Sequence, residues 1–252
     1  MNISLCFYGL SCGANDKNDI VTYKDALNSI KKYIIEPNNK INNKCDIFFH
    51  TWVHNTLNVD TILNDYNTIL NDYKPIKHKI DKRIKFDNNI RWNSYSSRWY
   101  SHGEVLKLKK EYENKNNFKY DYVMLIRFDC IFKTEILFNF SNEYIYSAIW
   151  YDAPESVKKT QLLEYWFILN SKNADLFSNI YDKLNIYRNK YGDISTHRLP
   201  KLHLEEEKID DKIKFVFAEY CHFTLERYKE RKIEEKYKYL LLENKTFSTL
   251  DP

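Results

Sequence analysis

An arginine and an aspartate follow the most apolar run of the sequence and could together bind a phosphorylated ligand. Residues 122–126 are apolar or aromatic without a break, which is typical of a central strand covered on both faces. Arg127 and Asp129 come next, and side chains two positions apart on a strand share a face. Beside a ligand, the guanidinium could bind phosphate and the carboxylate a divalent metal. The alternative interpretation is an ion pair that only ends the strand.

Residues after two other apolar runs could line the same site. Gly9 follows the run 3–8, and only 4 of the 252 residues are glycine. Without side-chain bulk, backbone N–H groups near Gly9 could approach a nucleotide, although an ordinary strand-to-helix turn also uses glycine. Thr51 lies near the end of the run 45–52. Because ligands of open α/β sheets bind at the carboxyl ends of the strands, these residues are expected to meet.

The elements that would position these residues alternate between strands and helices. Apolar runs predict strands at 3–8, 45–52, 76–80, 122–126, 144–150 and 212–218, and the segment 223–225 is expected to be extended. Helical spacing predicts helices at 25–35, 59–70, 103–112 and 174–187, and Pro37 is expected to end the first of them. The segment 87–99 shows no clear period and is expected to be a loop. This order predicts an α/β fold with a mostly parallel, doubly wound sheet flanked by helices.

Composition narrows the class of protein. Charged residues make up 29% and the formal net charge is +4, so no strongly basic face indicates nucleic acid as a partner. Lysine-rich segments, 107–119 and 228–238, are expected to be solvated helix faces. No signal peptide or membrane span is expected. The five scattered cysteines favour a reducing compartment. The expected location is therefore cytoplasmic, or the host cytoplasm if the protein is viral.

Several short motifs, in this order, resemble landmarks of the glycosyltransferase-like proteins of large DNA viruses and bacteria, which have the GT-A nucleotide-sugar fold. The resemblance spans the chain from Ile3 to about Arg227. The motifs are Phe7-Tyr8-Gly9-Leu10-Ser11, His50-Thr51-Trp52, Tyr120-Asp121-Tyr122 through Arg127-Phe128-Asp129, Glu164 through Ser171, His197-Arg198-Leu199 with His203-Leu204, and Leu225-Glu226-Arg227.

The resemblance implies one GT-A-like domain over residues 1–228 and a nucleotide-diphosphate sugar as donor. Its first half, 1–130, would bind the nucleotide sugar, its second half, 131–228, the acceptor, and 229–252 would be a helical extension or tail. In this family the donor is often held through Mn²⁺ or Mg²⁺ by an Asp-x-Asp motif, which here reads Arg127-Phe128-Asp129. Either Asp129 still binds metal, or Arg127 neutralises part of the diphosphate and weakens the need for metal. The residues expected to bind the donor are Gly9, Leu10, Ser11, Thr51 and Arg127.

Transfer of a sugar with inversion needs a base for the acceptor hydroxyl, and transfer with retention needs a nucleophile or an anion stabiliser. The resemblance places an acid at Glu164, and Asp152 and Glu155 follow the predicted strand 144–150. Glu164 has the better claim to be the catalytic base, and Asp152 is the second catalytic candidate, with contact to the sugar or acceptor as its alternative role. A late histidine, His197, could complete the metal shell, although a capping or packing role is the simpler interpretation for it and for His203.

Two classes of function stay open at this point. One is a glycosyltransferase that moves a sugar from a nucleotide donor to a glycan or glycoprotein acceptor. The other is a GT-A domain that binds a glycan or a partner protein without turnover, because Arg127 stands where the motif has a carboxylate.

Overall fold

The computed structural model describes residues 1–14, 20–53, 59–150 and 153–228, and it is an α/β fold built on one seven-stranded sheet. Strands from both expected halves, 1–130 and 131–228, belong to this sheet, whereas the expected tail 229–252 lies outside the described residues. In spatial order the strands are β10 (Ile213–Ala218), β8 (Ile145–Ile149), β9 (Leu163–Leu169), β6 (Tyr122–Arg127), β1 (Asn2–Gly9), β4 (Lys44–Val53) and β5 (Lys77–Lys82).

The sheet is mostly parallel, as predicted. Pairing is parallel between β1 and β4, β1 and β6, β4 and β5, and β8 and β10. Strand β9 pairs antiparallel with both of its neighbours, β6 and β8. Two small sheets accompany the large one, β7 (Cys130–Phe132) with β11 (Phe223–Leu225) and β2 (Gly13–Ala14) with β3 (Ile20–Val21). The expected extended segment 223–225 is thus confirmed as a strand.

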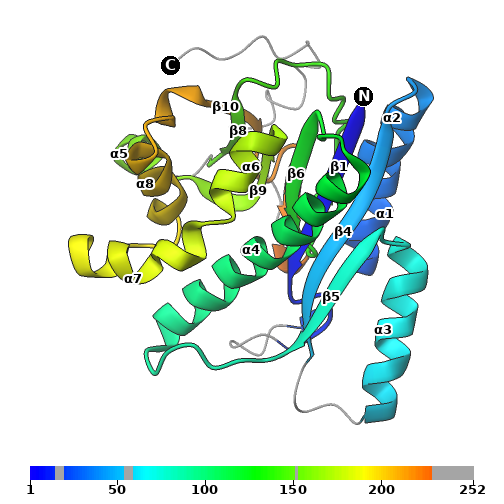
Figure 1. The fold of residues 1–252 in the computed structure, drawn as a ribbon, viewed down its shortest axis with the longest axis horizontal. Coiled ribbons are helices and arrows are strands. Elements are labelled where there is room, and N and C mark those ends of the chain that lie inside the picture. Colours follow the sequence, from blue (N-terminus) through cyan, green and yellow to red (C-terminus); the bar gives the residue numbers. More distant parts are fainter. Residues whose placement is uncertain (15–19, 54–58, 151–152, 229–252) are drawn as a thin grey trace.

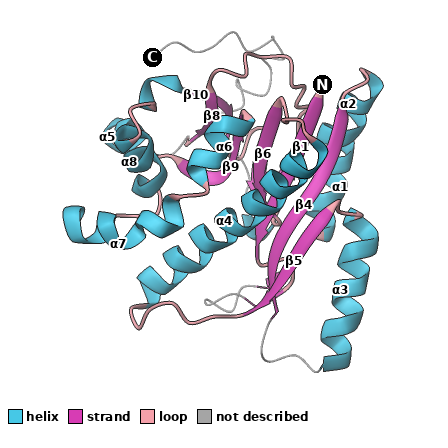
Figure 2. Cartoon of the chain, viewed as in Figure 1, coloured by secondary structure: helices cyan, strands magenta, loops and turns pink. Residues whose placement is uncertain are grey.

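Helices cover both faces of the sheet (Figures 1 and 2). The long helix α4 (Ile90–Asn116) crosses one face over β1 and β4, while α1 (Lys24–Ile30) lies behind the sheet. The remaining helices are η1 (Lys31–Ile35), α2 (Glu36–Lys40), α3 (Val59–Tyr73), α5 (Glu155–Thr160), α6 (Ser171–Phe177), α7 (Ile180–Tyr191), α8 (Arg198–Glu206), η2 (Asp210–Lys212) and η3 (Glu226–Tyr228). Among the described residues no helix combines the length and the apolar character needed to cross a membrane.

The alternation of side chains along the strands divides the core into two parts. In β1, Leu5 and Phe7 pack on the α1 side, whereas Cys6 and Tyr8 pack on the α4 side. All four side chains are buried, which explains why the strand is apolar without a break. The central strands are therefore held rigidly from both faces, and the residues at their ends have fixed positions.

The first helical region continues past the proline that was expected to end it. Helix α1 passes through the wider turn of η1, a π-helix, into α2, which ends at Lys40. The N–H of Glu36 donates to the carbonyl of Lys31, five residues back. Pro37 then occupies the first turn of α2, where its missing N–H costs least, so the helix is not broken.

The segment 87–99 is mostly helix, which corrects the prediction of a loop. Helix α4 begins at Ile90, and the side chain of Asn89 accepts hydrogen bonds from the N–H groups of Arg91 and Trp92. Trp92 and Trp99, seven residues apart, are both buried, and this spacing repeats on one helix face. Aromatic packing and the cap thus override a polar composition that otherwise indicates a loop.

We expect Asn89→Ala to lower the free energy of unfolding by about 1 kcal/mol, because the substitution removes the N-terminal cap of α4. Denaturation in urea measures the loss as a shift of the midpoint. Asn88→Ala, one position earlier and exposed, is the matched control. Equal effects of the two substitutions would contradict a capping role for Asn89.

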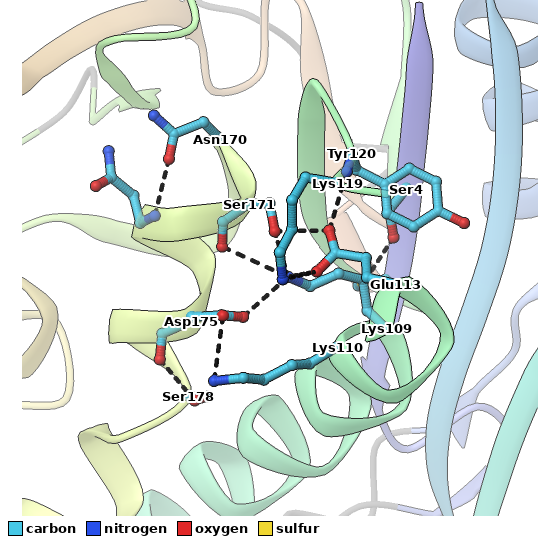
Figure 3. Close-up of polar contacts among 12 residues, drawn as sticks. Ser4, Lys109, Lys110, Glu113, Lys119, Tyr120, Asn170, Ser171, Asp175 and Ser178 are labelled. Carbon is cyan, nitrogen blue, oxygen red and sulfur yellow. Dashed lines mark hydrogen bonds and ion pairs between the residues drawn. The ribbon is translucent and has the colours of Figure 1, made fainter. Parts of the chain in front are cut away.

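A buried ion cluster fastens the second half of α4 to the start of β6 and to α6 (Figure 3). The Lys109 ammonium group lies 3.2 Å from Glu113, 2.9 Å from Asp175 and 2.9 Å from the Ser171 hydroxyl. Glu113 also accepts the N–H of Tyr120 at 2.9 Å. Lys109 and Glu113 are completely buried, so the expectation of a solvated lysine-rich face is wrong for Lys109. The neighbouring charges compensate its burial.

The helix expected over 174–187 is divided into α6 and α7, with the cap of α6 supplied by Asn170, whose side chain accepts the N–H of Asn173. The five cysteines are free thiols, as expected, and Cys6, Cys130 and Cys221 are buried.

Candidate functional site

The carboxyl ends of β1, β4 and β6 meet at one edge of the sheet, which we name the carboxyl edge. Strand β1 lies between the other two, so Gly9 is opposite Thr51 and Tyr8 is opposite Arg127. The chain leaves β1 toward β4 and later returns to β6 on the other side, so the strand order reverses at β1. Open α/β sheets bind ligands at such a reversal. The prediction that these strand ends meet is confirmed, and the carboxyl edge is the candidate site.

The turn after β1 is held by hydrogen bonds that use its own backbone N–H groups. Gly9 has a φ of 96°, which favours glycine, and its N–H donates to Oγ of Ser101 in α4 at 2.8 Å. The N–H of Ser11 donates to Oγ1 of Thr51 at 3.2 Å, and the Thr51 hydroxyl donates to Oγ of Ser11 at 2.9 Å. These two N–H groups, which were expected to approach a nucleotide, are therefore engaged within the protein. Leu10, half-buried, lies between them.

Behind this turn, a chain of hydrogen bonds runs from α4 through β4 to β5. His50 Nδ1 lies 2.7 Å from the Ser101 hydroxyl, and Nε2 lies 3.1 Å from Asp81. Burial raises the pKa of Asp81, but the hydrogen bonds that its carboxylate accepts have the larger combined effect, the strongest being the one from Lys79. The pKa of Asp81 is therefore below its usual value. An ionised carboxylate only accepts hydrogen bonds, so the His50 proton belongs on Nε2 and Ser101 donates to Nδ1. Burial lowers the pKa of His50 and keeps it neutral, which fixes Ser101 beneath Gly9.

Arg127 and Asp129 bind each other at the end of β6. The Arg127 Nε and Nη2 groups donate to the two carboxylate oxygens at 2.8 and 2.7 Å, as a two-pronged fork. The guanidinium lies 5.3 Å from the ring centroid of Tyr165, and the N–H of Glu226 donates to the carbonyl of Asp129 at 2.8 Å. The ion pair offered as the alternative interpretation is therefore present. Because the fork uses Nε and Nη2, the Nη1 end of Arg127 is turned away from Asp129.

This arrangement does not suit a divalent metal at Asp129. Both carboxylate oxygens are bonded to a guanidinium, whose positive charge repels another cation placed beside it. The other expected ligand, His197, directs Nδ1 at Glu164. Across residues 1–14, 20–53, 59–150 and 153–228, no three His, Cys, Asp or Glu side chains form a group that could hold a metal ion. The fork therefore leaves Arg127, rather than a metal at Asp129, as the positive charge at this strand end.

Glu164 reaches the carboxyl edge because β9 runs against its neighbours. The start of an antiparallel strand lies beside the ends of the parallel ones, and Glu164 is the second residue of β9. One carboxylate oxygen is paired with Nη1 of Arg98 from α4, and the other is paired with Nδ1 of His197. The Tyr8 hydroxyl donates to the carbonyl of Glu164 at 2.6 Å, and Arg98 also donates to Thr196 at 3.1 Å. Glu164 thus joins β1, α4 and the start of α8.

The charges around Glu164 keep it ionised although it is almost completely buried. Burial raises the pKa of Glu164, but Arg98 and then His197 outweigh burial and lower the pKa below its usual value. A carboxylate with a lowered pKa is a weak base, and both of its oxygens already face other side chains. Glu164 therefore lies at the carboxyl edge, and its surroundings suit a residue that holds Arg98 and His197 in place.

The side chains around Glu164 are more accessible than Glu164 itself. The side chain of Glu164 is 1% exposed, whereas Arg98 and His197 are 22% and 23% exposed. The His197 ring lies 4.4 Å from the ring of Trp150, at the end of β8. Arg98 and His197 are thus the groups of this cluster that a ligand at the carboxyl edge can touch.

Three other residues considered from the sequence do not contribute described side chains to the carboxyl edge. Asp152, the second expected catalytic carboxylate, lies outside the described residues. Glu155 is exposed in α5 and pairs with Lys158 at 2.8 Å. His203 is buried and lies 2.7 Å from the Tyr187 hydroxyl, which confirms a packing role.

Sequence reasoning missed Arg98 and Ser101, because both lie in or beside the segment taken for a loop. The signal was the spacing of Trp92, Tyr95 and Trp99, whose burial fixes the face of α4 that meets the sheet. Ser101 is buried at the sheet and Arg98 adjoins this face.

Neither the family models nor the curated proteins compared with this sequence match it.

Proposed function

We propose that the protein is a GT-A-like glycosyltransferase that moves a sugar from a nucleotide-diphosphate donor to a glycan or protein acceptor. The observation that carries the proposal is the convergence of Arg127, Arg98 and His197 at the carboxyl edge. The three side chains come from separate elements and are partly exposed. Both guanidinium groups interact electrostatically with the buried Tyr8. Burial raises the pKa of Tyr8, and the positive charges of the two arginines act in the opposite direction. Such a cluster suits a ligand with two phosphates.

The fold supports the same proposal. The mostly parallel sheet, with its strand order reversed at β1, provides the edge at which α/β proteins bind nucleotides. In the proposed complex Arg127 approaches the diphosphate with Nη1 while Asp129 keeps the guanidinium oriented. Arg98, held by Glu164, adds a second positive charge. The leaving diphosphate is then neutralised by side chains, which stabilises the charge that develops in the transition state.

One observation favours a second function, a domain that binds a glycan or partner protein without turnover. Asp129, the carboxylate that the family motif would use for metal, is fully engaged by Arg127. Nucleotide binding distinguishes the two functions, since a glycan- or protein-binding module has no need for a nucleotide diphosphate.

Calorimetry with UDP-glucose, GDP-mannose and dTDP-glucose, each in EDTA and in Mn²⁺, tests the proposal. We expect one of the three to bind in EDTA and to raise the melting temperature by mass action. Release of nucleoside diphosphate in the presence of an acceptor would establish turnover. Absence of binding by all three at millimolar concentration would refute the glycosyltransferase, and binding that needs Mn²⁺ would restore the metal role of Asp129.

Arg127→Lys is expected to weaken donor binding about tenfold, which corresponds to about 1.4 kcal/mol, because lysine keeps the charge but loses the planar fork. Calorimetric titration with the donor that binds the unmodified protein measures the change. Arg91→Lys is the matched control, since Arg91 is 52% exposed and pairs with Asp193 on the surface. Equal affinities of the Arg127→Lys and Arg91→Lys proteins would remove Arg127 from the donor site.

A further inference from the structure

We infer that His197 is the group that accepts the proton of the attacking hydroxyl, and that Glu164 is its positioning residue. The inference rests on the proposed glycosyl transfer and names the base for that reaction. It replaces the sequence-based expectation that Glu164 itself removes the proton.

The contacts of His197 determine which of its nitrogens is available. Nδ1 is paired with Glu164, and the two nitrogens lie on opposite sides of an imidazole ring, so Nε2 is directed away from that carboxylate. Because an ionised carboxylate only accepts hydrogen bonds, Nδ1 carries a proton and Nε2 of the neutral ring carries a lone pair. A carboxylate on one nitrogen and a reactive lone pair on the other is the arrangement by which proteins orient a histidine base.

The position of His197 is fixed from three sides. Its carbonyl accepts the N–H of Leu162, the residue directly before β9, at 2.8 Å. Its ring packs against Trp150 at the end of β8, and its Nδ1 meets Glu164 in β9. His197 also directly precedes α8. A ring held in this way needs little further ordering when a substrate binds, which is what a proton acceptor at a defined point requires.

Access separates His197 from Glu164. A base must come within about 2.6–3.2 Å of the oxygen whose proton it takes. The side chain of Glu164 is 1% exposed, with Arg98 on one oxygen and His197 on the other. The side chain of His197 is 23% exposed. A substrate hydroxyl at the carboxyl edge can therefore reach the imidazole without displacing an existing ion pair.

The proposed step is a direct displacement with inversion. The acceptor oxygen forms a bond to the anomeric carbon while the bond from that carbon to the diphosphate oxygen breaks. The electron pair of the broken bond leaves with the diphosphate, which the arginines neutralise. The hydroxyl proton moves to Nε2 of His197, and the resulting imidazolium is stabilised by the ionised Glu164 at Nδ1. Water in place of the acceptor follows the same course and gives donor hydrolysis.

Donor hydrolysis by two variants tests this assignment without knowledge of the acceptor. His197→Asn retains a side-chain N–H group for Glu164 but has no basic nitrogen, and His197→Ala leaves space for free imidazole. We expect both to hydrolyse the tightest-binding nucleotide sugar of the panel about 10²- to 10⁴-fold more slowly, with unchanged calorimetric affinity. Added imidazole should restore part of the rate to His197→Ala and none to His197→Asn or Glu164→Gln.

The control is His78→Ala, at an exposed position on β5, which should hydrolyse the donor at the normal rate. Melting temperatures establish that each variant is folded. A near-normal rate for folded His197→Asn would overturn the inference, as would a slow His197→Ala protein that binds donor but gains nothing from imidazole. By contrast, absence of nucleotide-sugar binding by the unmodified protein would refute the proposed function itself.

Discussion

Replacement of Glu164 with glutamine is expected to slow sugar transfer about 10²- to 10⁴-fold while donor affinity stays unchanged. Glutamine has the shape of glutamate, but its amide presents an NH₂ group in place of one of the two carboxylate oxygens that face Arg98 and His197. It therefore cannot accept from both Arg98 and His197, and it cannot stabilise a positive charge on the imidazole. Release of nucleoside diphosphate measures the rate, and calorimetry measures donor affinity.

Glu111→Gln makes the same chemical change on the outer face of α4. Glu111 is 62% exposed and pairs with Lys77 at 2.8 Å, so its substitution should leave transfer unchanged. If Glu164→Gln turned over as fast as this control, Glu164 would have no part in the reaction. A fall in donor affinity equal to the fall in rate would instead place Glu164 in the donor site.

The second large effect is on stability. We expect Lys109→Met to lower the free energy of unfolding by about 3–5 kcal/mol, because the substitution removes the buried cation that is paired with the buried Glu113. Lys119, which also contacts Glu113, is 56% exposed and compensates only in part. The midpoint of denaturation in guanidinium chloride measures the loss, provided that the slope of the transition is unchanged.

Lys110→Met is the matched control, one residue along the same helix. Lys110 is 51% exposed and pairs with Asp175 at the surface, at 3.2 Å, so its loss should cost about 1 kcal/mol or less. Similar midpoints for the two methionine variants would mean that the buried ion cluster contributes nothing net to stability.

The strand ends were predictable because their determinants are local. The unbroken apolar runs of β1, β4 and β6 can only be buried on both faces, and parallel strands bring their carboxyl ends to one edge. Gly9, Thr51 and Arg127 could therefore be placed together from the sequence. The second half was harder, since the direction of β9 depends on pairing with β6 and β8, and the resemblance alone brought Glu164 forward.

The partners of these residues were not predictable, because they depend on distant segments. Nothing near Glu164 in the sequence indicates Arg98, which is 66 residues away. The fork between Arg127 and Asp129 could be anticipated as an alternative, but the choice between metal ligand and ion pair depends on the side-chain geometry. In α4, burial of Trp92 and Trp99 determines the structure of a segment whose polar residues favour a loop.

The continuity of α4 has a consequence for how the protein tolerates heat. Arg98 and Lys109 belong to one helix and are separated by about 16 Å along its axis. The first contributes to the carboxyl edge and the second anchors the helix at the opposite end of the sheet. If the contacts of Lys109 weakened on heating, α4 could tilt slightly. Arg98 would then be displaced before the sheet unfolds. If the protein is the proposed enzyme, its turnover would then decline at temperatures where most of the chain is still native, and a more stable contact at Lys109 would raise that temperature.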